Sequence, residues 1–186
     1  HDSASIDTAF NLIGMITQRN GFPLFGTQVV FTEPANWNGD MLVVGKTSDI
    51  PKSIMDGAPM QTDGVSTVLY PVSRGWDNET SISLSKQKSG LGEGSGVLME
   101  FESAHQKGRS VVLATAQTEK DLLTLGDALL DSGILSRITG DIALIKLDVP
   151  GYDLTSMSSG KRYSTGDKGK VSFIDSVLYA NIYAIY

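Results

Sequence analysis

Apolar residues recur at helical spacing in two stretches of the chain. Residues 5–20 predict an amphipathic helix that ends at Asn20-Gly21. Its expected buried stripe consists of Ile6, Ala9, Phe10, Ile13 and Ile16. Residues 119–131 predict a second helix, because Leu122, Leu125, Leu129 and Leu130 follow a Thr118-Glu-Lys-Asp121 segment that is similar to a capping box. A short helix is expected between Pro51 and Gly57.

Continuous or alternating apolar runs predict the strands between these helices. The runs at 40–45, 97–103, 109–116 and 141–148 predict strands, and 109–116 is the most apolar of them. Three further strands are predicted at 27–32, 65–72 and 80–86, and a short one at 161–166. The expected core consists of Val43, Val44, Val112, Leu113, Ala114 and Ile142–Ile145, packed against helices at 6–19 and 119–131.

This alternation predicts an α/β layered domain with a largely parallel central sheet. The middle of the chain, residues 65–103, is expected to form a hairpin that is inserted in this sheet or lies at its edge. We find no repeat or linker that would divide the chain of 186 residues, so we expect one domain. The chain begins without Met or a signal peptide, and we expect it to be a piece of a longer protein.

The last residues differ in kind from the rest. Residues 167–186 predict an amphipathic, Tyr-rich helical tail that is too short and too interrupted to span a bilayer. The candidate membrane or partner contacts are Ile174, Val177, Leu178, Tyr179, Ile182, Tyr183, Ile185 and Tyr186. Tyrosines on an apolar helix suit a membrane interface, although a terminal helix that docks on its own domain would show the same pattern.

The charge of the chain excludes one class of partner. The net charge is −6 and no basic block occurs, whereas nucleic-acid binding requires clustered Lys and Arg. The absence of Cys excludes a disulfide framework, a thiolate metal site and a cysteine nucleophile.

Two glycine-rich stretches are similar to nucleotide-binding loops. Gly45-Lys46-Thr47 ends like a phosphate loop, but Asp40 stands where that motif requires its first glycine. We therefore expect a strand end followed by a short helix that Thr47 or Ser48 caps. The second stretch, residues 90–96, leads into a strand rather than a helix, and we expect a mobile loop without a cofactor.

The sequence contains no convincing catalytic or metal site. A Ser-His-Asp triad requires a histidine, and the histidines are His1 and His105, the latter in a polar turn where we expect it to be solvated. Asp141 and Asp148 bracket one strand and should lie at its opposite ends, too far apart to act on one bond. No His or carboxylate pair has the spacing of metal ligands.

Trp37 and Trp76 are candidate saccharide contacts. Each lies in a predicted loop beside amide or carboxylate side chains, Asn36 and Asn38 in the first case, Asp77 and Asn78 in the second. An aromatic face with neighbouring polar groups is what a sugar ring needs, although isolated surface tryptophans are also common.

A longer stretch resembles a known family. The segment "GSGVLMEFESAHQKGRSVVLATAQTEKDLLTLGDALLD", followed by "GDIALIKLD" and "SGKRYSTG", resembles the periplasmic regulatory B subunit of bacterial cellulose synthase. "MLVVGKTSDIP" is similar to an earlier strand and turn of that family. The resemblance covers most of residues 1–166 and rests on order and pattern.

The resemblance implies a flavodoxin-like α/β domain over residues 1–166, expected to be the membrane-proximal one, with no bound flavin. It implies a non-catalytic docking role in cellulose synthesis and export, in the periplasm and associated with the inner membrane. The implied partners are the catalytic subunit, the membrane surface through the tail and, in addition, the glucan chain. Two alternatives stay open: a saccharide-binding module that uses the loop tryptophans, and a stand-alone module that binds a nucleotide or flavin.

Overall fold

The computed structural model describes residues 3–21, 23–24, 26–34, 37–60, 91–158 and 163–165. The elements in these ranges are α1 (Ser3–Asn20), β1 (Met41–Lys46), the 3-10 helix η1 (Thr47–Asp49), α2 (Lys52–Met55), β2 (Ser95–Glu102), β3 (Ser110–Ala116), α3 (Glu119–Leu130), α4 (Ser132–Leu135), β4 (Ile142–Lys146) and β5 (Asp153–Met157). The predicted strands at 65–72 and 80–86 lie outside the described residues.

The strands form one sheet with the order β1-β3-β2-β4-β5 over the described ranges. Only β1 and β3 pair in parallel there, whereas the pairs β3–β2, β2–β4 and β4–β5 are antiparallel. The α/β prediction is therefore confirmed, but the expected largely parallel sheet is wrong for this part of the chain.

Short connections explain two of the antiparallel pairs, β2–β3 and β4–β5. A parallel crossover needs about a dozen residues or more, and the segments at 103–109 and 147–152 are shorter, so each must join antiparallel neighbours. The hairpin predicted for residues 65–103 was allowed to lie at the edge of the sheet. β2 instead lies between β3 and β4. Because β2 is antiparallel to both, β1, β3 and β4 all run in the same direction.

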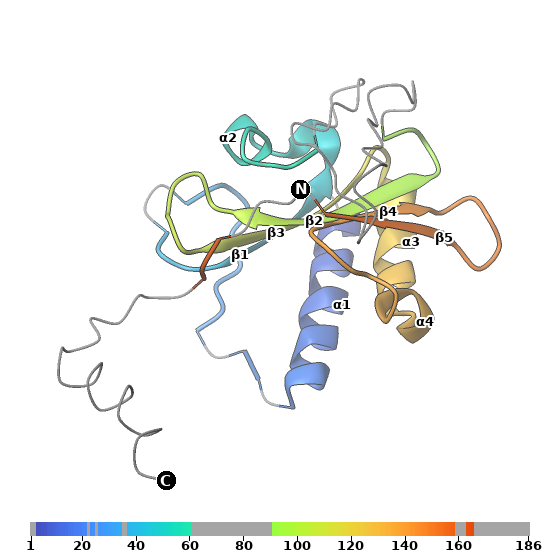
Figure 1. The fold of residues 1–186 in the computed structure, drawn as a ribbon, viewed down its shortest axis with the longest axis horizontal. Coiled ribbons are helices and arrows are strands. Elements are labelled where there is room, and N and C mark those ends of the chain that lie inside the picture. The colour runs from blue at the N-terminus through green and yellow to red at the C-terminus, as the bar shows by residue number, and fades with distance from the viewer. Residues whose placement is uncertain are drawn as a thin grey trace, which may run out of the picture.

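Helices cover both faces of the sheet. α1, α3 and α4 lie against one face and α2 against the other (Figure 1). The first face is buried by residues such as Leu122, Leu125 and Ile145, and the second by residues such as Met99, Leu113 and Ile142. The predicted core is confirmed for Leu113, Ala114, Ile142, Ala143 and Ile145, while Val43, Val44, Val112 and Leu144 are half-buried.

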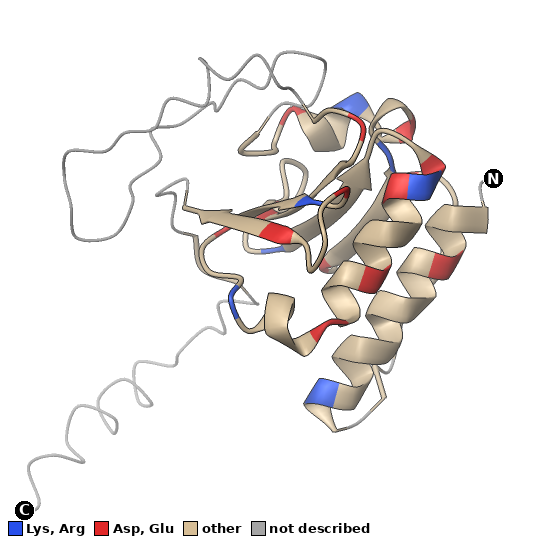
Figure 2. Ribbon diagram, turned by 90° about the vertical axis from the view of Figure 1, so that its right-hand side faces the viewer, with Lys and Arg blue, Asp and Glu red and all other residues tan. Residues whose placement is uncertain are grey.

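The buried face of α1 differs from the predicted one. Ala4, Thr8 and Leu12 are buried, whereas Phe10 is 58% exposed. α1 lies beside α3 (Figure 2), and small residues form the contact between them. The Thr8 hydroxyl donates to the Leu122 carbonyl at 3.2 Å, and a Cβ added at Gly126 would lie 3.1 Å from Thr8 Cγ2. The helices approach each other closely, so α1 buries the face with small residues rather than its most hydrophobic face.

Several local predictions are confirmed and others are wrong. The helices at 5–20, 51–57 and 119–131 form, and the Thr118 side chain caps α3 by accepting from the Asp121 amide. Neither Thr47 nor Ser48 caps η1, since its N-cap residue is Lys46 without a side-chain hydrogen bond.

The predicted strand at 27–32 is also wrong. Val29, Val30 and Phe31 are 55–59% exposed in an irregular segment that is not part of the sheet formed by the described strands. The described part of 161–166 forms no strand, and the chain instead forms β5 earlier, at Asp153–Met157.

Candidate functional site

The carboxyl ends of the parallel strands β1 and β3 meet the first turn of α3. An α/β fold commonly binds phosphate at such a place, where the helix presents free N–H groups. Here the Asp121 amide donates to the Thr118 hydroxyl, and the Gly94 amide donates to Asp121 Oδ2 at 3.1 Å. The Thr118 hydroxyl donates to the same carboxylate at 2.8 Å. The chain's own side chains thus occupy these donors.

The charges at this end are also unfavourable for phosphate. Lys46 Nζ pairs with Glu119 Oε1 at 3.2 Å and with Asp49 Oδ2 at 3.6 Å, so its charge is already compensated. The residue Asp121 is only 8% exposed and lies in the first turn of α3, where a phosphate would have to approach. The Thr47 hydroxyl contacts Thr115 Oγ1 and the Ala116 carbonyl, both at 3.3 Å. These contacts support the prediction that the Gly45-Lys46-Thr47 turn is structural.

A second group of polar residues lies near the beginnings of β1 and β3. We name it the Trp37 cluster; its members are Trp37, Asn38, Asp40, Glu100, Arg109, Ser110 and Tyr163. Asp40 Oδ1 accepts from the Ser110 amide at 2.8 Å and so joins the two strand starts. The Trp37 indole N–H donates to the Asp40 carbonyl at 3.2 Å, and Arg109 Nε donates to Asn38 Oδ1 at 3.3 Å. Asp40, which excluded a phosphate loop, therefore positions the start of β3.

Tyr163 brings a distant part of the chain into this cluster. Its hydroxyl lies 3.0 Å from the Ser110 hydroxyl and donates to Glu100 Oε1 at 3.3 Å. Burial raises the pKa of Tyr163 above its ordinary value of 10.0, the Ser110 hydrogen bond lowers it, and the negative charge of Glu100 raises it further. The phenol is therefore held neutral as a hydrogen-bond donor.

His105 is exposed, as predicted, but it has a partner. Its Nε2 lies 3.0 Å from Glu33 Oε1, and Ser53 Oγ donates to the other oxygen of the same carboxylate. In a hydrolase triad the imidazole stands between the hydroxyl and the carboxylate, whereas here the carboxylate stands in the middle. The group therefore connects the segment before β1 with α2 and with the β2–β3 loop. The imidazole is not placed to activate Ser53.

The remaining sequence candidates divide into two groups. Asp141 and Asp148 precede and follow β4, so they lie at its opposite ends as predicted. Trp76 and all the tail candidates lie outside the described residues. Within the ranges that the structure describes, no three His, Asp or Glu side chains converge as metal ligands would, and no helix is long and apolar enough to cross a membrane.

The fold and these sites define a mixed α/β domain whose strand-end polar groups bond mainly to one another. Residues 1–114, more than half of the chain, match the family described as the second FD domain of cellulose synthase BcsB, and the chain belongs to this family. Membership implies a role within the regulatory subunit of cellulose synthase and association with a catalytic subunit. A comparison with curated proteins gave no match.

Sequence reasoning missed most of the Trp37 cluster. Trp37 was a candidate because of its amide neighbours, but Ser110 and Tyr163 had no signal of their own. Ser110 opens an apolar strand, and Tyr163 lies 53 positions further along the chain. Their proximity depends on the strand order β3-β2-β4-β5 of the sheet, because Tyr163 follows β5, and no local pattern encodes this order.

Proposed function

We propose that this chain is a non-catalytic docking domain of the cellulose synthase regulatory subunit, which supports the catalytic subunit during cellulose synthesis and export. The match of residues 1–114 to the second FD domain of BcsB carries this proposal. The strand ends that resemble a phosphate site support it as well, because the chain's own side chains engage the Gly94 and Asp121 amides and Lys46 there. β1, β3 and β4 run in one direction, which supports a relationship to the flavodoxin-like layout with β2 inserted.

Docking is proposed to reside in the apolar tail. On this proposal residues 1–166 are the folded domain, and residues 167–186 contact the catalytic subunit or the membrane surface on the periplasmic side. The apolar face of Ile174, Leu178 and Ile182 beside the tyrosine face supports this assignment, since such a helix suits both surfaces. Burial of several such side chains favours association by about 25 cal/mol for each Å² of apolar area, before ordering costs are subtracted.

The test is co-purification of the full-length regulatory subunit with the catalytic subunit, together with flotation on liposomes. A variant with Ile174→Ser, Leu178→Ser and Ile182→Ser should remain folded and lose subunit or liposome binding. The matched control carries Phe10→Ser, Val29→Ser and Val30→Ser, which remove exposed apolar side chains from the domain itself. Unfolding of the tail variant, with unchanged binding by its folded fraction, would show that the tail is ordinary core.

A further inference from the structure

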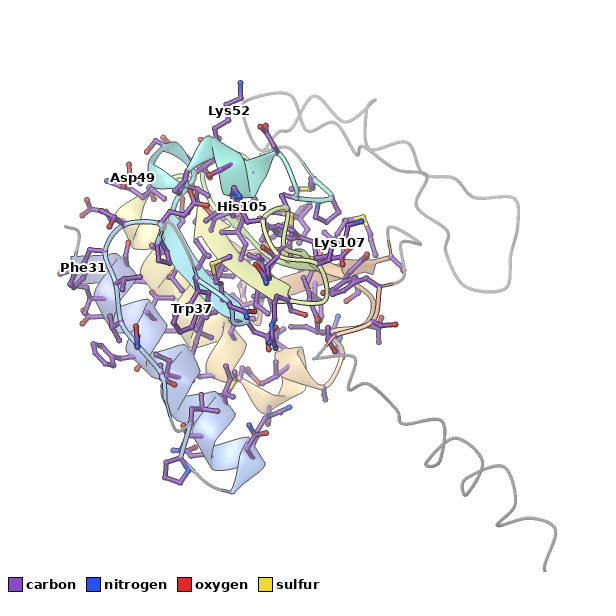
Figure 3. All side chains as sticks on the ribbon, turned by 90° about the vertical axis from the view of Figure 1, so that its left-hand side faces the viewer. Phe31, Trp37, Asp49, Lys52, His105 and Lys107 are labelled. Atoms are coloured by element: carbon purple, nitrogen blue, oxygen red, sulfur yellow. The ribbon has the colours of Figure 1, made fainter. Side chains whose placement is uncertain are left out.

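The Trp37 ring is held in a fixed orientation at the surface. Its N–H donates to the Asp40 carbonyl at 3.2 Å. A Cβ added at Gly39 would lie 2.8 Å from three atoms of the indole, so the ring rests on a backbone position that only glycine accommodates without a shift. Trp37 is half-buried beside β1 (Figure 3). An aromatic side chain held in this way loses little freedom when a ligand binds to its accessible part.

The polar groups beside the ring are also fixed by their neighbours. Arg109 and Asn38 bond to each other at 3.3 Å, and both retain accessible surface. The Tyr163 hydroxyl is held between Ser110 and the exposed Glu100. The cluster therefore combines an apolar ring with a guanidinium donor, an amide, a phenol and a carboxylate acceptor.

We propose that the Trp37 cluster binds a β-1,4-linked glucan. A pyranose ring offers an apolar C–H face that stacks on an aromatic ring and equatorial hydroxyls that both donate and accept. The cluster supplies these complements, whereas the carboxylates of Asp40 and Glu100 disfavour an anionic ligand such as a nucleotide. The choice of glucan among saccharides rests on the proposed function, because that function places the domain in a complex that makes cellulose.

The experiment is a titration of the 186-residue chain with cellohexaose, followed by the NMR signals of the two tryptophan indole N–H groups. Maltohexaose, which has the same sugar with α-linkages, is the control ligand. The Trp37 indole signal should shift with cellohexaose and stay in place with maltohexaose. Calorimetry gives the dissociation constants of the variants, including those that lack the Trp37 signal. The dissociation constant should rise about tenfold in Trp37→Ala, since stacking on one aromatic face contributes about this much.

Further variants separate binding from folding. Trp37→Phe keeps an aromatic face and should bind more tightly than Trp37→Ala. Phe10→Ala, which removes an exposed aromatic ring from α1, should leave the affinity unchanged. If Trp37→Ala does not fold, Tyr163→Phe and Asn38→Ala test the same surface from its polar side and should each weaken binding. Absence of a shift with cellohexaose, or equal affinity in all variants, would overturn the proposal.

The failure of this proposal can be distinguished from failure of the docking function. Trp37→Ala in the full-length regulatory subunit should leave co-purification with the catalytic subunit unchanged, because the tail is proposed to dock. If cellohexaose does not shift the Trp37 indole signal and co-purification is normal, only the glucan contact is overturned. Loss of co-purification in Trp37→Ala would instead assign the cluster to the subunit interface and overturn the glucan proposal.

Discussion

Leu125 is the side chain whose removal tests the packing of α3 most sharply. It is fully buried, at 0% exposure, and it rests directly on Gly96 in the central strand β2. A Cβ added at Gly96 would lie 2.9 Å from Leu125 Cδ1 and 3.0 Å from Cδ2. Leu125→Ala should lower the free energy of unfolding by about 2 to 5 kcal/mol, through lost burial and the cavity that remains.

The reverse perturbation at the same contact should also destabilise the fold. Gly96→Ala introduces a methyl group where Leu125 leaves no room, and overpacking of this kind costs about 1 to 3 kcal/mol. In the double variant the two shortest contacts, with Leu125 Cδ1 and Cδ2, are removed, and only the Cβ atom at 3.1 Å remains close to the new methyl group. The loss in the double variant should therefore be smaller than the sum of the two single losses by about 1 kcal/mol or more.

Urea unfolding followed by circular dichroism gives the required free energies by linear extrapolation. Leu123→Ala is the matched control, because Leu123 lies on the same helix and is 41% exposed, and its loss should stay within about 0.5 kcal/mol. A loss below about 0.5 kcal/mol for Leu125→Ala would show that the helix presents another face. Additivity of the two substitutions within about 0.5 kcal/mol would show that Leu125 does not rest on Gly96.

Three further predictions concern the strand ends. Calorimetry should detect no micromolar binding of FMN, ATP or GTP, because the chain's own side chains engage the amides of Gly94 and Asp121; clear binding would refute this. Thr118→Ala should lower the free energy of unfolding by about 1 to 2 kcal/mol, through the lost cap of α3, and a urea midpoint equal to that of the unsubstituted chain would contradict it. The pKa of Tyr163 is raised in the folded state above 10.0, so stability should fall as the pH rises from about this value through the folded-state pKa. In Tyr163→Phe this part of the decline should disappear, and equal slopes of stability against pH would show that Tyr163 does not contribute.

Local sequence patterns correctly predicted the elements whose apolar residues recur at the spacing of one helix face or along one strand. The leucines of residues 119–131 and the apolar run at 110–116 predicted α3 and β3 because each pattern fills a buried surface almost alone. The capping role of Thr118 was also readable, since a cap depends on residues within one turn.

Contacts between distant residues explain what the sequence did not predict. Thr8 and Gly126 bring α1 close to α3. Because Thr8 faces α3, Phe10 is exposed, although the apolar periodicity placed it in the buried stripe. The place of β2 between β3 and β4 depends on pairing across the sheet, which strand propensity does not specify. At the candidate site, Trp37 was predicted from the sequence. The hydrogen bonds that connect it through Asp40 and Ser110 to Tyr163 were known only from the fold.

The most direct test of the docking function is photo-crosslinking in the intact synthase. A photoreactive residue is placed at position 178 in the tail of the full-length regulatory subunit and, as a control, at the exposed position 123 on α3. Crosslinks are expected from position 178 to the catalytic subunit or to lipid, and none to the catalytic subunit from position 123. Crosslinks from position 178 that reach only residues of the same domain would contradict a docking role of the tail, because the tail would then be part of the domain's own core.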